Sequence, residues 1–208
     1  MTHARSRNDA HCNGGSCFPK DVRALIKTAQ DHDVPMRILE AVETVNDTRK
    51  RAMARKVSSA FAGVLRGKTV AVLGLTFKPN TDDMREAPSI PLITALQDMG
   101  AKVRVYDPVG MEQAKLVLAD VTYCHGPYDC VEEADAVVIV TEWEQFRALD
   151  LERLRDLMAC VMVDLRNVYR PDEMKQHGFA YSCVGRVPTH QPARVQVPTS
   201  RTETLTRR

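Results

Sequence analysis

Residues 69–75 read Thr-Val-Ala-Val-Leu-Gly-Leu, and residues 136–141 read Ala-Val-Val-Ile-Val-Thr. Short runs of this kind, rich in β-branched residues and apolar through the middle, are typical of strands buried on both faces of a sheet. Strand and helix patterns alternate from Gly67 to about Val184. This rhythm predicts an α/β fold: a Rossmann-like doubly wound parallel sheet with helices on both faces.

The other predicted elements of the sheet region are short and end at turn residues. They are strands at 102–106, 121–123, 160–164 and 179–184, and helices at 89–99, 110–118, 151–158 and 171–176. Ligands of such sheets bind at the carboxyl ends of the strands. The loops expected at that edge are residues 76–88, 106–110, 141–146 and 165–171.

The region before the sheet is predicted to be helical. Pro19 suits a first helical position and Asp21 a first turn, so one helix is expected to run to about Asp31. No Gly or Pro occurs between Pro35 and Gly63, which predicts a second helix of roughly 40 Å. A helix of that length is expected to connect domains or to form a dimer.

These patterns divide the chain into four segments. They are an aberrant or disordered start at 1–13, a helical central segment at 14–66, a Rossmann-like domain at 67–186 and a disordered tail at 187–208.

Composition excludes several classes of protein. The 29 basic and 27 acidic residues leave a net charge of +2, which gives no electrostatic case for binding nucleic acid. No apolar run approaches the roughly 18 residues of a membrane span, and no secretory signal is present, so a cytoplasmic location is expected. The six cysteines lack regular spacing and predict reduced thiols, with neither a disulfide framework nor a metal site.

Residues 14–21, Gly-Gly-Ser-Cys-Phe-Pro-Lys-Asp, carry a candidate nucleophile. A helix N-terminus and the charge of Lys20 both favour the thiolate form of Cys17. The glycines allow the backbone to approach a ligand closely, and Asp21 could orient a water molecule or take a proton. The alternative is a small buried cysteine on a turn, but the neighbouring residues favour the nucleophile.

Residues 74–89 form a long polar loop where the first strand opens into its helix. Lys78 and Arg85 in this loop suit a diphosphate, Lys78 as a point charge and Arg85 as a fork of donors. The alternative is a surface loop in which these cations pair with acids of the same loop. Those acids are Asp82, Asp83 and Glu86. Charge alone leaves both interpretations open.

Two residues near predicted strand ends also have two interpretations. Asp107 could bind a ribose or form a turn before Pro108. Trp143 could line a nucleotide pocket or belong to the core, which is favoured. The ten glycines include no G-x-G, so no dinucleotide fingerprint is predicted.

Four spaced motifs resemble the UDP-glucose/GDP-mannose dehydrogenase family of nucleotide-sugar 6-dehydrogenases. They are GGSCFPKD at 14–21, LGLTFKPNTDDMREAPS at 73–89, VYDP at 105–108 and DLRN at 164–167. The resemblance covers residues 14 to about 186, and Phe18-Pro19-Lys20 favours the UDP-glucose branch.

The resemblance implies oxidation of UDP-glucose to UDP-glucuronate with two NAD. Cys17 would attack a C6 aldehyde to give a thiohemiacetal and then a thioester, and Asp21 would assist the hydrolysis. Cys17, Lys20 and Arg85 would face NAD. The residues implied to bind substrate are Gly14, Phe77, Lys78 and Arg166. The long helix would form a homodimer, and residues 67–186 would be the family's UDP-binding domain.

Members of this family begin with an NAD-binding domain, and its fingerprint is not found in this sequence. We therefore expect a truncated portion that is inactive alone, or one that a separately encoded NAD-binding domain completes. The alternatives are a non-catalytic remnant that binds a UDP-sugar or dimerises, and a fragment of a GDP-mannose or UDP-N-acetylmannosamine dehydrogenase.

Overall fold

The computed structural model of the chain describes residues 17–189. Its centre is a six-stranded, fully parallel sheet in the order β3-β2-β1-β4-β5-β6. This is the strand order of a doubly wound Rossmann-like sheet, so the predicted fold class is confirmed. The predictions for Gly14, for the start at 1–13 and for the tail beyond 189 lie outside the described residues.

The strands lie where the apolar runs predict them, shortened by a residue or two at several ends. They are β1 Thr69–Leu73, β2 Lys102–Tyr106, β3 Val121–Tyr123, β4 Ala136–Ile139, β5 Val161–Asp164 and β6 Ala180–Cys183. Strands β1 and β4 are the central pair, with Val70 opposite Ala136 and Leu73 opposite Ile139. Apart from Thr69 at the start of β1, their sequences are entirely apolar, because helices cover both faces of the sheet.

Six helices accompany the sheet. They are α3 Ser89–Asp98, α4 Met111–Lys115, α5 Pro127–Val131, α6 Glu144–Arg147, α7 Leu151–Leu157 and α8 Pro171–Gln176. The sequence patterns did not predict α5 and α6. These helices have 5 and 4 residues, which is too short for a helical apolar period to be visible.

Alternate residues of each central strand point into two separate cores. Val70 and Val72 of β1 pack with α2, α3 and α4, whereas Ala71 and Leu73 pack with α5, α6, α7 and α8. All four of these side chains are fully buried. The molecule is therefore a three-layer sandwich in which β1 contributes to both interfaces.

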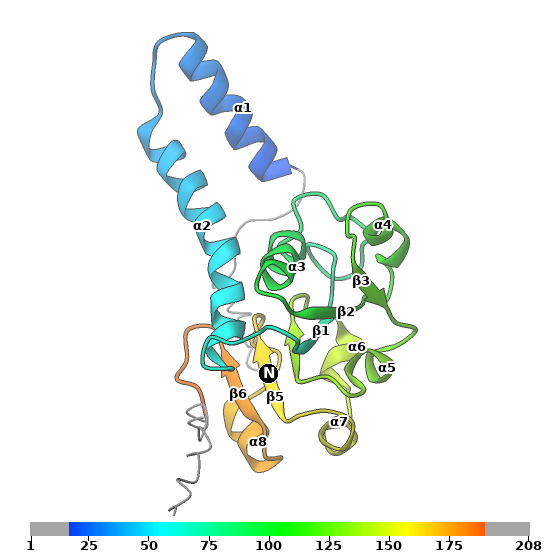
Figure 1. Ribbon diagram of the computed structural model, residues 1–208. Helices are drawn as coiled ribbons and strands as arrows, with labels where there is room; N and C mark the ends of the chain where they lie inside the picture. Colours follow the sequence, from blue (N-terminus) through cyan, green and yellow to red (C-terminus); the bar gives the residue numbers. More distant parts are fainter. Residues whose placement is uncertain (1–16, 190–208) are drawn as a thin grey trace, which may run out of the picture.

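Helices α1, Cys17–Asp31, and α2, Arg37–Ser59, form an antiparallel pair that extends away from the sheet (Figure 1). The C-terminal half of α2 packs beside α3 and buries Ala54 and Val57. The N-terminal half leaves Ile38 exposed at 80%. Helix α2 ends at Ser59, before Gly63, and its 23 residues span about 35 Å. Within residues 17–189, no helix combines the length and apolarity needed to cross a bilayer.

Candidate nucleotide-binding site

The carboxyl ends of the central strands hold a cluster of buried polar side chains. Each follows a different strand of the sheet: Thr76 after β1, Asp107 after β2, Thr141 after β4 and Asp164 at the end of β5. Buried polar groups require partners. Those partners join the predicted loops into one structure.

Asp107 organises the centre of this edge. Its Oδ2 accepts hydrogen bonds from the backbone nitrogens of Leu75 at 2.7 Å and Thr76 at 3.3 Å, from Thr76 Oγ1 at 3.3 Å and from Trp143 Nε1 at 3.1 Å. Its Oδ1 accepts from the backbone nitrogens of Val109 and Gly110 at 3.0 and 2.7 Å. Asp107 is thus turn-forming and ties three loops together, which favours the turn interpretation over a ribose-binding acid.

Trp143 belongs to the core, as the sequence analysis favoured. It is only 6% exposed and packs in the α5–α8 layer. Because its indole nitrogen needs a partner when buried, the bond to Asp107 explains why a tryptophan is tolerated there.

Gly74 brings the ends of β1 and β4 close together. Its φ is +89°, and an added Cβ would lie 2.6 Å from the backbone nitrogen of Thr141. Thr141 Oγ1 also donates a 2.6 Å hydrogen bond to the carbonyl of Thr76. The glycine therefore serves strand packing at a position where dinucleotide-binding sheets use a glycine-rich turn for a pyrophosphate.

Arg166 spans this edge from β5 towards β1. Its Nε donates to the carbonyl of Val140 at 2.8 Å and its Nη2 to the carbonyl of Phe77 at 3.0 Å. An ion pair with Glu142 at 2.9 Å supports the guanidinium, whose side chain is 10% exposed. The guanidinium therefore joins the loops that follow β1 and β4 to the end of β5.

Phe77 and Lys78 lie at the same place as Arg166. The Lys78 Nζ is 5.2 Å from the centroid of the Phe77 ring, and Lys78 is exposed to solvent. The structure therefore brings together three of the residues that the resemblance assigned to substrate, namely Phe77, Lys78 and Arg166. Their chemistry, a ring and two cations, suits a nucleotide with an attached phosphate.

Asp164 fixes the start of the segment that carries Arg166. Its carboxylate accepts from the backbone nitrogens of Arg166 and Tyr169 at 2.9 and 3.0 Å and from the Tyr181 hydroxyl at 2.7 Å. Burial raises the pKa of Asp164, and these hydrogen bonds oppose the rise. The DLRN motif thus combines a buried anchor with a partly exposed arginine.

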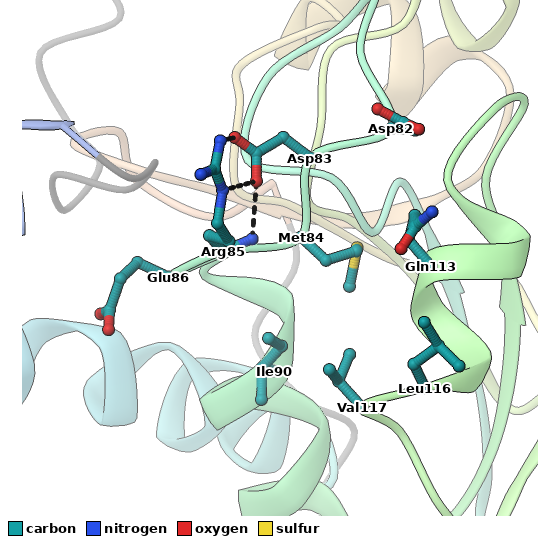
Figure 2. Close-up of a pocket in the computed structure, with 9 residues that line it drawn as sticks. All are labelled: Asp82, Asp83, Met84, Arg85, Glu86, Ile90, Gln113, Leu116 and Val117. Atoms are coloured by element: carbon teal, nitrogen blue, oxygen red, sulfur yellow. Dashed lines mark hydrogen bonds and ion pairs between the residues drawn. The ribbon is translucent and has the colours of Figure 1, made fainter.

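Arg85 lies in a different part of the loop. Its Nε and Nη2 bind Asp83 at 2.9 and 2.8 Å, and this guanidinium holds the pKa of Asp83 below its usual range. Figure 2 shows the pair at the rim of a pocket of about 530 Å³ between this loop and helices α3 and α4. Arg85 therefore pairs with an acid of its own loop in this structure, as the surface-loop interpretation expects.

Cys17 is the first residue of α1, whereas the sequence predicted it just before the helix. Pro19 is consequently the third helical residue and Asp21 the fifth, one position beyond the first turn. Both Lys20 and Asp21 are exposed. The positive end of the helix dipole remains at Cys17.

Ion pairs join α1 and α2 to the β1–α3 loop. They are formed by Arg23, Lys50 and Glu86, none of which was predicted as a site residue from the sequence. Only Glu86 was mentioned, as an expected partner for Lys78 or Arg85. Its partners instead come from distant segments, which no spacing rule indicates.

Two further cysteines are neighbours: Cys124 directly follows β3, and Cys130 is a residue of α5. Hydrogen bonding from Cys130 lowers the pKa of Cys124 to about 7 and, together with burial, raises that of Cys130. Among residues 17–189, no three His, Cys, Asp or Glu side chains gather as a metal site.

Comparison with known proteins decides the family. The model of the UDP-glucose/GDP-mannose dehydrogenase family's UDP-binding domain matches residues 71–171, and the model of that family's central domain matches residues 6–48. The chain belongs to the UDP-glucose/GDP-mannose dehydrogenase family. The UDP-binding match contains the Asp107 centre, Phe77, Lys78 and Arg166, so this resemblance is confirmed.

Individual members of the UDP-glucose/GDP-mannose dehydrogenase family agree with this assignment. A UDP-glucose 6-dehydrogenase from Rhizobium meliloti is 58% identical over 174 residues, and one from Pseudomonas aeruginosa is 45% identical over 180 residues. Each match covers 83% of this chain and 40% of the relative. The solved UDP-glucose dehydrogenase from Pyrobaculum islandicum is 37% identical with a TM-score of 0.67, over 81% of this chain and 37% of that protein.

Proposed function

We propose that the chain provides the UDP-binding domain and the cysteine-bearing helix of an NAD-dependent UDP-glucose 6-dehydrogenase. The main support for this proposal is the cluster of Phe77, Lys78 and Arg166. These residues lie at the carboxyl edge of the sheet, in the region that matches a UDP-binding domain. Lys78 and Arg166 supply the charges for the phosphates, and Phe77 supplies an apolar surface. UDP-glucose is the proposed ligand.

In the proposed reaction, the C6 alcohol of UDP-glucose first loses a hydride and its hydroxyl proton to give a C6 aldehyde, and Cys17 is then the nucleophile. Its thiolate adds to the carbon of a C6 aldehyde, and the carbonyl oxygen takes a proton to complete the thiohemiacetal. Loss of a hydride from that carbon, with loss of the hydroxyl proton, leaves a thioester. Water cleaves the thioester to the carboxylate and restores the thiol, and Asp21 accepts a proton from the water.

NAD, when bound, would supply the acceptor for each of the two hydrides, one NAD for each oxidation. The described residues fit contact with its diphosphate, because Lys20 and Arg85 are exposed cations on α1 and on the β1–α3 loop. They do not fit the whole dinucleotide, because Gly74 packs against Thr141 where the phosphate-binding turn is needed. We therefore propose that a separately encoded NAD-binding domain is a partner of this chain and binds the rest of the dinucleotide.

We further propose a homodimer formed through α2 and a cytoplasmic location. Exposed Ile38 and Val45 on the N-terminal half of α2 support the dimer.

Calorimetric titration of the 208-residue chain with UDP, UDP-glucose and GDP tests the proposed function. UDP and UDP-glucose should bind more tightly than GDP. Lys78→Ala should weaken UDP binding by about tenfold, the value of one charge-assisted contact. Lys102→Ala is the matched control, because this exposed lysine begins β2 at the opposite edge of the sheet. Equal affinity of the two variants, or no UDP binding, contradicts the proposal.

A further inference from the structure

Glu86 occupies an unusual position at the end of the β1–α3 loop. Its backbone φ is +54°, a left-handed conformation that is unfavourable for a glutamate. Its carboxylate accepts from Arg23 Nη1 and Nη2 of α1, both at 3.0 Å, and from Lys50 Nζ of α2 at 3.1 Å. One side chain thus binds both helices of the projecting pair to the loop.

Both partners of Glu86 also contact a second carboxylate, and for Lys50 this is Asp47 at 3.7 Å, a longer distance than to Glu86. Lys50 is only 5% exposed, and a buried ammonium is retained only with a paired anion nearby. Arg23 uses its remaining Nε to bind Glu43 of α2 at 2.6 Å. The two cations lower the pKa of Glu86 to about 2 despite its partial burial, so the carboxylate is charged at neutral pH.

This ionic connection joins two parts of the proposed catalytic machinery. Arg23 lies six residues after Cys17 on α1, a distance of about 9 Å along the helix axis. Glu86 directly follows Arg85, near the end of the loop that also carries Phe77 and Lys78. Movement of α1 relative to this loop would therefore change the separation between Cys17 and the nucleotide site.

We propose that Glu86 is a positioning residue, which holds the Cys17 helix in a fixed place relative to the UDP-binding loop. This inference rests on the proposed function. Glu86 need not touch substrate, because it acts through Arg23 and Lys50 on the placement of α1. Loss of its charge should release α1 while the nucleotide contacts of Lys78 and Arg166 remain.

The test uses a UDP-sugar with a chloroketone at C6, which alkylates a thiol near the bound sugar. Peptide mass spectrometry monitors the alkylation of Cys17 in the full chain over time. The dependence of the alkylation rate on the concentration of the chloroketone gives an inhibition constant and a maximal rate. Iodoacetamide labelling of Cys17 corrects for intrinsic thiol reactivity. Glu86→Gln should lower the corrected maximal rate by roughly tenfold, because misplacement of about 1 Å can cost more than this. The inhibition constant should stay unchanged.

Two variants serve as controls. Glu112→Gln changes an exposed glutamate that pairs with Lys115 within α4, and it should behave as the parent chain. Glu86→Asp keeps the charge and should recover part of the rate. Hydrogen exchange provides an independent readout: Glu86→Gln should speed exchange in α1 and leave β1 protected.

Each outcome separates the two proposals. If the UDP-sugar chloroketone does not alkylate Cys17 of the parent chain faster than iodoacetamide reactivity predicts, the proposed function fails and the positioning role fails with it. If the parent is labelled and Glu86→Gln reacts at the same corrected rate, the positioning role alone is overturned. A rise in the inhibition constant with an unchanged maximal rate also overturns it, because Glu86 would then act on nucleotide binding.

Discussion

Replacement of Asp107 by asparagine should strongly destabilise the chain. Asp107 is 1% exposed, and its two carboxylate oxygens accept from six donor groups. The asparagine amide replaces one of these oxygens by an NH₂ group, which donates and cannot accept. The less damaging orientation directs the amide NH₂ at the backbone nitrogens of Val109 and Gly110. One buried donor, Gly110 N, and one part-buried donor, Val109 N, then lose their acceptor, at about 1–3 kcal/mol each, and the remaining bonds lose their charge assistance. The expected loss is about 3–5 kcal/mol.

Urea unfolding of the two proteins measures this loss. Trp143 is the chain's single tryptophan and bonds directly to Asp107, so its fluorescence reports the local structure while circular dichroism reports the whole fold. Asp120→Asn is the control, because this exposed aspartate has a φ of +55°, which asparagine adopts readily. A loss below about 1 kcal/mol for Asp107→Asn would refute the view that this carboxylate organises the edge.

Three further predictions concern the same edge and its connection to α1. Gly74→Ala should lower the free energy of unfolding in urea by at least about 2 kcal/mol more than Gly178→Ala. Both glycines have positive φ, but of the two only Gly74 would place a Cβ 2.6 Å from another atom. Equal losses contradict the close packing of β1 and β4. Glu86→Gln should lower stability by about 1–2 kcal/mol at neutral pH, after discounting for exposure. The pKa of Glu86 is lowered from 4.5 to about 2, so this difference should be full above about pH 5 and vanish as the pH falls towards 2; a pH-independent difference argues against the ionic connection. Trp143→Phe should lower the free energy of unfolding by about 2 kcal/mol by removing the indole bond to Asp107. The loss should be smaller when Asp107 is already asparagine, because the remaining amide oxygen accepts the indole bond without a charge.

The layers of the fold could be predicted because their signal is local. Runs such as residues 69–75 contain no polar interruption, and a sheet buried on both faces requires this pattern wherever the strand lies. The short helices α5 and α6 could not be predicted, since tertiary contacts of Cys130 and Phe146 hold them rather than any periodicity.

The site could be predicted in part for a different reason. Phe77, Lys78 and Arg166 come from motifs whose order resembles a family, and the structure brings them together at one edge. The residues that hold the edge were not predicted as such. Asp107 and Glu86 obtain partners from segments distant in the chain, and only the folded structure makes those pairs neighbours.

Mapping of bound UDP by amide chemical shifts tests the central claim most directly. The ¹⁵N-labelled 208-residue chain is titrated with UDP, and perturbed backbone amides are placed on the structure. The largest changes should lie at residues 75–78 and 165–167, at the carboxyl ends of β1 and β5. Changes confined to the amino ends of the strands, near residues 67–69 and 100–102, or no changes at saturating UDP, would contradict the account.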